Sequence, residues 1–315
     1  MKNFLSITDL TPKEMRDIFY STKRLKQEQK SKGGQKLTLK GKSLALIFEK
    51  QSLRTRISFE IGMAQLGGYT VYLDPRDTGI GIRESEADVA KVLSEMVNII
   101  AARTYSHQTI VTIAQNAAIP VINALSDLEH PCQALTDLFT IWEVKKYNKI
   151  SGLTIAYVGD GDNNVAHSLC LGAAMMGINF RCGSPKGFRI NEGVAEKAKK
   201  LSKNNNSLIV QTIEPKEAVK DADVVVTDTW VSMGDTDKGK RMDIFKPYQV
   251  NRKLMQYAKK DAIFMHCLPA YRGNEVTADV IDGPQSIVFQ EAENRLHIQK
   301  AMLVYLLQRT KDLDS

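Results

Sequence analysis

Five short stretches of this 315-residue chain carry side chains that could bind an anion, polarise a carbonyl group or hold an amine. Each follows an apolar run typical of a buried β-strand, directly or after a short loop. Because ligands of open α/β sheets bind at the carboxyl ends of the strands, chemistry is expected at these positions. The stretches are 49–56, Arg103, 130–133, 159–164 and the pair formed by 228–234 and 266–269.

Stretch 49–56 predicts an oxyanion or phosphate site. It lies between an apolar run and the helical run 57–66, and Ser52 is a residue type that caps helix N-termini. The N–H groups and the positive dipole end of a helix N-terminus favour an anion. The guanidinium groups of Arg54 and Arg56 can each bind phosphate through two parallel hydrogen bonds. A capped helix with both arginines in surface ion pairs is the alternative.

Arg103 and His130 follow two further apolar runs, 99–102 and 121–124. A single histidine in a loop is either a structural residue or a donor at the active site, and the sequence leaves both readings open. A lone histidine is more often structural, but its place beside Pro131 and Gln133, near the carboxyl end of a strand, gives the second reading equal weight.

The turn 159–164 contains a G-x-G pattern but does not predict a dinucleotide site. Asn164 stands where the third glycine would be, and no acidic residue ends the following strand to bind a ribose hydroxyl. An NAD-dependent dehydrogenase is therefore a weaker alternative. A tight turn that presents Asn164 to a polar ligand fits the residues better.

The last two stretches offer a carboxylate and a thiol. Asp228 could pair with an ammonium group, or could be an ordinary turn residue. Cys267 could be a nucleophile, but a buried unreactive thiol is the commoner case. Successive side chains of a strand face opposite sides, so we expect His266 to point away from Cys267.

Apolar runs alternate with helical patterns along the chain, which is the signature of βα units and parallel sheets. We predict an α/β fold of two doubly wound domains, each a mostly parallel sheet flanked by helices. The expected domains are 1–148 and 149–315, with a last helix at about 291–308 that packs back on the first domain. The predicted strands are 43–48, 69–73, 99–102, 121–124, 154–158, 179–182, 207–212, 224–227 and 263–266.

The clearest helical pattern spans 84–97, where apolar residues recur at the i, i+3, i+4, i+7 spacing of one buried stripe. The residues expected on that stripe are Val89, Val92, Leu93, Met96 and Val97.

Composition excludes several other classes of protein. The chain is 43% hydrophobic and 25% charged, which is typical of a globular protein. No apolar run reaches the roughly 18 to 20 residues of a membrane span, so we expect a cytoplasmic protein without membrane contact. Four cysteines without a CxxC pair argue against disulfides and structural zinc. The net charge of +7 is scattered, which argues against a nucleic-acid partner and leaves an anionic substrate open.

Taken together in order and spacing, several motifs resemble the carbamoyltransferase family, and most closely its ornithine-specific members. The resemblance covers nearly the entire chain. The motifs are Ser52-Leu53-Arg54-Thr55-Arg56, His130-Pro131-Cys132-Gln133, Asn163-Asn164, Asp228 with Ser232-Met233-Gly234, His266-Cys267-Leu268-Pro269 and Glu293-Asn294-Arg295.

This resemblance implies transfer of a carbamoyl group from carbamoyl phosphate to the side-chain amine of L-ornithine, giving citrulline and phosphate, within arginine metabolism. The amine would attack directly and form a tetrahedral intermediate with an oxyanion. No metal and no organic cofactor is expected. The family also implies a homotrimer, or a multiple of trimers, with active sites at the subunit interfaces.

Roles of individual residues follow from the same resemblance. The expected catalytic residues are Thr55, Arg103 and His130, as donors to the carbonyl oxygen, and Cys267, near the reacting amine. Arg56 is expected to support the loop internally. The expected carbamoyl phosphate ligands are Ser52, Leu53, Arg54, Thr55, Arg103, His130, Gln133, Cys267, Leu268 and Arg295, and the expected ornithine ligands are Asn164, Asp228, Ser232 and Met233.

Two departures from the family pattern and some alternatives remain. Gly79 stands where family members commonly carry a Gln or His that enters a neighbouring subunit's active site. The turn from Gly159 to Asn164 has one extra residue. Aspartate, putrescine and acetylated ornithine are alternative acceptors, and the biosynthetic or catabolic direction stays open.

Overall fold

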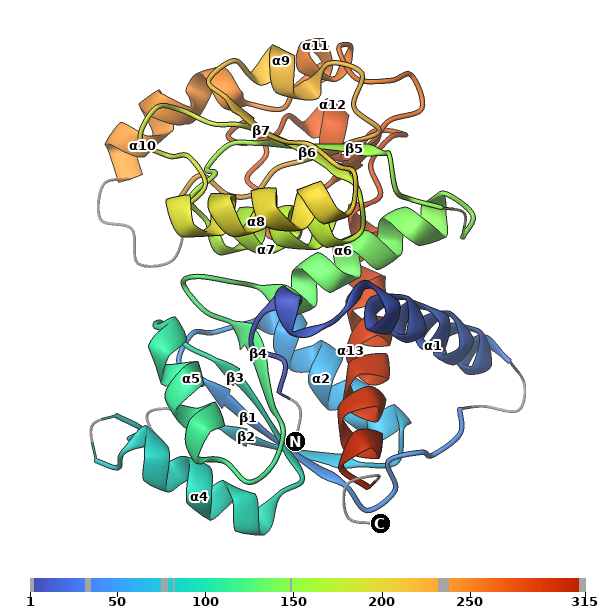
Figure 1. Cartoon of the computed structure of the whole chain (residues 1–315), viewed down its shortest axis with the longest axis vertical. Helices are drawn as coiled ribbons and strands as arrows, with labels where there is room; N and C mark the ends of the chain where they lie inside the picture. The colour runs from blue at the N-terminus through green and yellow to red at the C-terminus, as the bar shows by residue number, and fades with distance from the viewer. Residues whose placement is uncertain are drawn as a thin grey trace. The chain divides into compact units, whose positions relative to one another are not determined.

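The computed structural model of the protein describes residues 3–31, 35–74, 79–81, 83–147, 149–231 and 238–311. The chain divides into two compact units, each built around a parallel β-sheet with helices packed on it (Figure 1). The first unit comprises Met1–Thr136 and Glu293–Ser315, and the second comprises Asp137–Ala292. The predicted fold class, two α/β domains with one parallel sheet each, is confirmed.

The first unit contains a four-stranded sheet in the order β2-β1-β3-β4. All of its strand pairs are parallel, and Phe48 pairs with Arg103, which in turn pairs with Leu125. The carboxyl ends of three neighbouring strands are therefore aligned at one edge. The strands are β1 (Ser43–Phe48), β2 (Tyr69–Leu73), β3 (Ile99–Arg103) and β4 (Val121–Leu125).

Helices lie on both sides of this sheet, with α4 and α5 on one side and α2 and α13 on the other (Figure 1). Buried residues of β1, β3 and β4 pack against α4 and α5 in one apolar cluster. The helices are η1 (Ile7–Asp9), α1 (Pro12–Lys30), α2 (Leu53–Gln65), α4 (Glu86–Met96), α5 (His107–Asn116), the first part of α6 (Pro131–Val144) and most of α13 (Val288–Lys311).

The buried stripe expected on the helix at 84–97 is partly wrong. In α4, Val89 and Ala90 are buried and Leu93 packs against the core, as does Val97 directly after the helix. Val92 is 46% exposed and Met96 is 71% exposed. The helix is rotated so that the small Ala90 enters the core, and positions 92 and 96 then lie toward solvent, because residues three to four apart share a face.

The second unit contains a five-stranded parallel sheet in the order β7-β6-β5-β8-β9. Helices α7 and α8 lie on one side of it, and α9, α11 and α12 on the other (Figure 1). The elements are β5 (Thr154–Val158), α7 (Asn164–Met175), β6 (Asn179–Gly183), α8 (Glu192–Asn204), β7 (Ile209–Thr212), α9 (Pro215–Val219), β8 (Val224–Val226), α10 (Lys238–Phe245), η2 (Lys246–Tyr248), α11 (Arg252–Met255), β9 (Ile263–Met265) and α12 (Ala278–Ile281).

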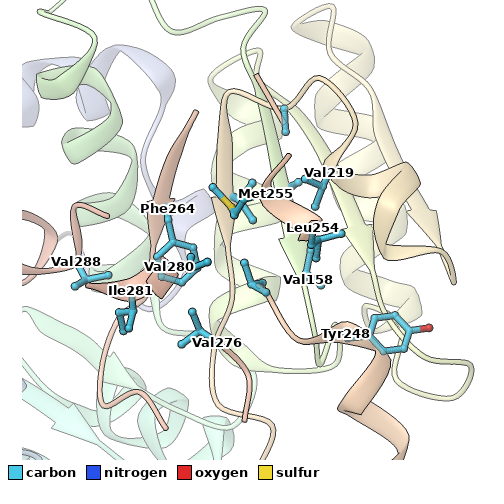
Figure 2. Packing of buried hydrophobic residues seen from close by; sticks show 14 residues of the cluster. Val158, Val219, Tyr248, Leu254, Met255, Phe264, Val276, Val280, Ile281 and Val288 are labelled. Carbon is cyan, nitrogen blue, oxygen red and sulfur yellow. The ribbon is translucent and has the colours of Figure 1, made fainter. Parts of the chain in front are cut away.

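An apolar core holds this sheet to its second helix layer (Figure 2). Val158 and Phe264 of the strands meet Val219, Leu254 and Ile281 of the short helices, all fully or almost fully buried. Burying a side chain of this size contributes roughly 1.5 to 3 kcal/mol. The packing keeps the ends of β5, β8 and β9 fixed relative to one another.

Helix α13 packs on the first unit, as the sequence predicted. Its Lys300 ammonium contacts the Gln65 side chain of α2, and the Tyr305 hydroxyl donates to Glu14 of α1. In the part of the chain that the structure describes, none of the helices has both the length and the apolar character needed to cross a membrane.

Candidate functional site

The first group of predicted residues surrounds the N-terminus of α2, directly after β1. Ser52 caps the helix, since its hydroxyl oxygen accepts a hydrogen bond from the Thr55 backbone N–H at 3.2 Å. The N–H groups of a first helical turn have no acceptor within the helix, so they can bind an anion. The buried Arg54 Nε has no hydrogen-bond partner among the described residues. These features agree with the oxyanion or phosphate site predicted at residues 49–56, which is called the anion loop below.

Arg103 and His130 lie at the same edge of the sheet. Arg103 is the last residue of β3, and its neighbour in register on β1 is Phe48. His130 directly precedes α6, in the loop that follows β4. Both side chains are almost fully buried. Parallel pairing thus places them beside the anion loop, because β1, β3 and β4 are adjacent strands.

Arg295 reaches this edge from α13. Its Nη2 donates a hydrogen bond to Thr55 Oγ1 at 2.6 Å, and both side chains are buried. A cation from the C-terminal helix therefore lies at the capped end of α2. Arg54, Arg103 and Arg295 make this part of the first unit strongly basic.

His130 is held in its neutral form by these surroundings. Burial lowers its pKa well below the ordinary value, and the positive charges of Arg295 and Arg103 lower it further. A neutral imidazole has one nitrogen that donates and one that accepts. At neutral pH the ring can therefore donate one hydrogen bond to a substrate oxygen without carrying a charge.

The other predicted residues of this group differ in burial. Gln133 is fully buried in the first turn of α6, whereas the Leu53 side chain is exposed, so Leu53 could bind an anion only through its backbone. Arg56 donates to Glu60 at 2.9 Å and lies over the Tyr72 ring at 3.8 Å. Arg56 is exposed, and its pairing with Glu60 within α2 corresponds to the surface ion pair that the sequence left as the alternative for this arginine.

The second group lies in the second unit, around Asp228. This buried carboxylate follows β8 and accepts hydrogen bonds from the Cys267 thiol at 3.3 Å and from Asn163 Nδ2 at 3.2 Å. The backbone N–H of Thr229 donates to it at 2.8 Å. The ends of β5, β8 and β9 thus converge on one carboxylate, which is suited to bind an amine cation.

The contact from Asn163 was missed by the sequence prediction, which assigned the turn's role to Asn164. Asn163 caps α7 by accepting from the backbone N–H groups of Val165 and Ala166, and its Nδ2 remains directed at Asp228. Asn164 is the first residue of the helix and is half-buried. The preference of Asn for the N-cap was the signal that could have assigned this role to Asn163.

The expected orientation of His266 is wrong. A ring nitrogen of His266, the Cys267 sulfur and an Asp228 oxygen all lie within 4.8 Å of one another. Strand β9 ends at Met265, so the alternation of a strand does not extend to these residues. Instead, His266 Nδ1 accepts from the Leu268 backbone N–H at 2.9 Å, and Leu268 has a left-handed φ of +57°.

The same three side chains form the one group of possible metal ligands found among the described residues. Most of their possible ligand atoms are already hydrogen-bonded, while His266 Nε2 lies 3.4 Å from a Glu275 carboxylate oxygen. Both oxygens of Asp228 accept hydrogen bonds, and His266 Nδ1 binds Leu268. The geometry is that of a hydrogen-bonded network.

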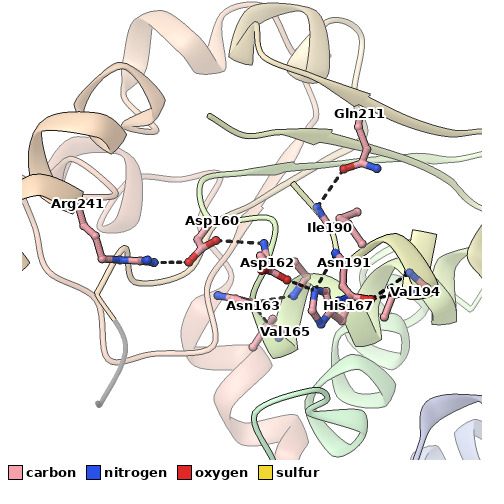
Figure 3. Close-up of polar contacts among 12 residues, drawn as sticks. Asp160, Asp162, Asn163, Val165, His167, Ile190, Asn191, Val194, Gln211 and Arg241 are labelled. Carbon is pink, nitrogen blue, oxygen red and sulfur yellow. Dashed lines mark hydrogen bonds and ion pairs between the residues drawn. The ribbon is translucent and has the colours of Figure 1, made fainter. Parts of the chain in front are cut away.

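The turn between β5 and α7 is tied to its surroundings by charged contacts (Figure 3). Asp160 pairs with Arg241 of α10, and Arg241 Nε also donates to the Trp230 carbonyl at 2.7 Å. Asp162, the extra residue of this turn, lies 3.2 Å from the ring of His167. The extra residue therefore lies beside α7 and leaves the Asn163 cap intact. The sequence prediction contained no role for Arg241.

Some predicted residues lie outside the described part of the chain. Ser232 and Met233, the remaining expected ornithine ligands, are among them, as is Gly234. Gly79 is described and has a φ of +60°, and a Cβ at this position would approach Arg83 Cβ to 2.9 Å. A side chain at position 79 is therefore incompatible with the observed backbone.

Comparisons with known proteins match one family model to the first part of the chain and another to the second part. The family model described as aspartate/ornithine carbamoyltransferase, carbamoyl-P binding domain, matches residues 2–143, and the model of the Asp/Orn binding domain of the same family matches residues 151–306. An ornithine carbamoyltransferase of Anoxybacillus flavithermus is 51% identical over 97% of this chain and 96% of its own length. That of Bacillus subtilis is 48% identical, over 97% and 94%.

Solved structures are similar over the same extent. The ornithine carbamoyltransferase from Pyrococcus furiosus superposes with a TM-score of 0.94 at 46% identity, covering 98% of this chain and 97% of the other. The anabolic ornithine carbamoyltransferase from Campylobacter jejuni gives a TM-score of 0.91 at 38% identity, covering 98% and 100%.

Proposed function

The chain belongs to the aspartate/ornithine carbamoyltransferase family, and on that premise we propose that it transfers the carbamoyl group of carbamoyl phosphate to the δ-amine of L-ornithine, in arginine metabolism. It is an enzyme of the carbamoyltransferase class. In this proposal the first unit binds carbamoyl phosphate and the second binds ornithine. The matched descriptions of the two family domains support this division.

The hydrogen bond from Arg295 to Thr55 carries the proposal. It brings a guanidinium group to a capped helix N-terminus that already favours a dianionic phosphate. Ser52, Arg54 and Thr55 are proposed to bind the phosphate, together with the backbone N–H of Leu53. Gln133 and the backbone at Cys267 and Leu268 are proposed to bind the carbamoyl amide.

Catalysis is proposed to rest on stabilising the oxyanion. As the amine nitrogen bonds to the carbonyl carbon, charge develops on the carbonyl oxygen, and Thr55, Arg103 and the neutral His130 donate hydrogen bonds to it. Preorganised donors of this kind contribute about 3 to 4 kcal/mol each in other acyl-transfer enzymes. The bond from carbon to the phosphate oxygen then breaks, and the departing phosphate takes the proton that the amine releases.

The acceptor is proposed to bind through its α-ammonium group to Asp228. Asn164, Ser232 and Met233 are the proposed partners of the rest of its amino-acid end. The contact between Cys267 and Asp228 supports a position of the thiol near the acceptor. In this proposal Cys267 forms no covalent bond, because the amine itself is the nucleophile.

A homotrimer, or a multiple of trimers, is proposed as the assembly. Leu53, Ile57 and Ile61 form an exposed apolar stripe along α2, and Tyr69 and Val71 are exposed on the edge strand β2. Contiguous exposed apolar patches mark protein–protein interfaces. Because Gly79 offers no side chain, a neighbouring subunit would have to complete the site through other groups.

Formation of the carbamoylated acceptor by the purified protein, which is citrulline when the acceptor is ornithine, tests the function. Carbamoyl phosphate is held at saturation while ornithine, N-acetylornithine, putrescine and aspartate are compared at equal concentration. We expect activity with ornithine alone, which requires both the side-chain amine and the free α-ammonium group. Activity with aspartate or putrescine, or with none of the four, would reject the proposed acceptor.

A further inference from the structure

A buried lysine on α1 contacts the two residues that precede Arg295. Lys26 Nζ donates to Asn294 Oδ1 at 2.7 Å and lies 3.3 Å from a carboxylate oxygen of Glu293. The Lys26 side chain is only 10% exposed, whereas Lys30, one turn further along α1, is 68% exposed and lies 3.8 Å from the same carboxylate. Lys26 therefore fixes α13 at the start of the turn that carries Arg295.

A second buried lysine fixes α13 about one and a half turns later. Lys300 is fully buried, and its Nζ donates to three glutamine side-chain oxygens, Gln29 at 2.7 Å and Gln35 and Gln65 at 2.8 Å each. The three acceptors satisfy all three donors of an ammonium group. They come from α1, from the segment before β1 and from α2. Each N–H of the buried Lys300 ammonium group therefore has an acceptor of its own.

Helix α2 is tied to α13 at both of its ends. Near its N-terminus, Thr55 accepts from Arg295, and at its C-terminus, Gln65 accepts from Lys300. Between them, Gly62 lies so close that a Cβ there would approach Lys300 Cγ to 3.2 Å. The position of α13 along α2 is thus specified by polar contacts on both sides of a close helix approach.

We propose that Lys26 and Lys300 are positioning residues that hold Arg295 at the carbamoyl phosphate site. The contacts described above join the two lysines to Glu293, Asn294 and three glutamines, all of which lie outside residues 49–56. Burying two ammonium groups is costly, and apolar residues of similar volume would hold two helices together at least as well. Directional contacts instead specify one position of α13, and the Arg295–Thr55 hydrogen bond depends on that position. The inference rests on the proposed function for the identity of the anion.

Kinetics of Lys26→Met, with Lys30→Met as the matched control, test the proposal in the full-length protein. We expect Lys26→Met to raise the KM for carbamoyl phosphate about tenfold, which is the effect of one hydrogen bond to a charged group. The KM for ornithine and kcat should change little, and Lys26→Arg should restore most of the affinity. Lys300→Met should shift the KM in the same direction, and Lys30→Met should match the unchanged protein.

A double-variant cycle separates positioning from general stability. If Lys26 acts through Arg295, adding Lys26→Met to Arg295→Met changes the KM for carbamoyl phosphate no further. The proposal would be overturned if the KM of the double variant rose by the product of the two single effects, or if Lys26→Met left the KM unchanged. Should Lys26→Met fail to fold, Asn294→Ala removes the same contact from the other side.

Calorimetric binding of inorganic phosphate keeps this inference distinct from the proposed reaction. A protein that makes no citrulline but binds phosphate, with Lys26→Met and Arg295→Met weakening binding together, would retain the positioning role and reject the reaction. Citrulline formation, together with an unchanged phosphate affinity in Lys26→Met, would support the reaction and reject the positioning role.

Discussion

The thiol of Cys267 donates a hydrogen bond to Asp228 at 3.3 Å, and this pair joins the loop after β9 to the end of β8. Cys267 is also the one half-exposed cysteine of the four in the chain. Its partial exposure distinguishes Cys267 from the other three cysteines, which are buried, and makes it the thiol that a reagent in solution can reach.

Iodoacetamide at pH 8 should modify Cys267 first and leave the other three cysteines intact in the folded protein. Burial raises the pKa of Cys132 and Cys182 to about 12 and raises that of Cys170 as well, so their reactive thiolates are scarce. Peptide mass mapping of the labelled protein measures this. In Cys267→Ser, rapid labelling should disappear, and early modification of Cys132 would contradict the structure.

Replacement of Asp228 by Asn should weaken ornithine binding selectively. The change keeps the shape of the side chain but removes the charge that pairs with the ammonium group, at a cost of about 2 to 3 kcal/mol. The KM for ornithine should rise roughly 30-fold to 150-fold, and that for carbamoyl phosphate should stay constant. Asp279→Asn, an exposed acidic position of α12, is the control. A larger effect on carbamoyl phosphate would exclude Asp228 from the acceptor site.

Replacement of His130 by Gln should lower kcat while leaving the apparent pKa values of the pH–rate profile unchanged. Burial and the two neighbouring arginines hold the pKa of His130 well below its ordinary value, so this ring does not titrate between pH 6 and 9. Steady-state rates over that range test the prediction. Loss of an acid limb in His130→Gln would show that the ring does titrate there.

The same lowered pKa of His130 predicts a loss of stability in acid. Below about pH 6.5 the unfolded chain takes up a proton on this ring that the folded protein excludes, so the free energy of unfolding falls. Thermal unfolding of His130→Gln between pH 7.5 and 5 should show a smaller decrease in Tm than the unchanged protein. An equal decrease would place the acid-sensitive group elsewhere.

Lys300 predicts a rise of stability in alkali. Burial lowers its pKa from 10.5 to about 8, and the nearby Glu28 opposes this only partly. Between these two pH values the unfolded chain binds a proton that the folded one has released, so stability increases with pH and levels off above 10.5. Lys300→Met should remove this contribution, which unfolding curves from pH 7 to 10.5 would detect. If stability rose equally with pH in Lys300→Met and in the unchanged protein, the lowered pKa of Lys300 would be contradicted.

A charge on the apolar stripe of α2 should disrupt assembly. Ile57 is 49% exposed on α2, between Leu53 and Ile61. A carboxylate at this exposed position should leave the fold of a single chain intact. Ile57→Asp should shift the mass measured by light scattering toward the monomer. Val210→Asp, on an exposed strand position of the second unit, is the control. A monomeric unchanged protein would reject the proposed trimer.

Strand positions were predictable from the sequence, because buried parallel strands are short and almost wholly apolar. The predicted runs 43–48, 69–73 and 154–158 coincide with β1, β2 and β5. The run 207–212 starts two residues before β7, since in-register pairing with β6 begins only at Ile209, although the Leu208 carbonyl still accepts a hydrogen bond from the Phe180 N–H. Single-sequence patterns show which residues suit a strand, and the pairing partners decide where it ends.

The sequence predicted site residues that directly follow strands. It did not predict residues whose position depends on contacts between distant parts of the chain. Strand ends indicated Arg103, His130 and Asp228. No local pattern indicates that Arg241 binds Asp160 or that Lys26 binds Asn294, because these contacts join residues distant in the chain. Their partners become evident only once the helices are packed.

Most of helix α13, from Glu293 on, belongs to the first unit, although the second unit separates it from the rest of that unit in the chain. During synthesis on the ribosome, the nascent first unit therefore lacks Arg295 and Lys300 until the whole second unit has been synthesised. Domains generally fold in the order in which they emerge, but here the second unit can finish folding before the first. A chain that stops after Ala292 would contain the whole second unit but an incomplete anion site.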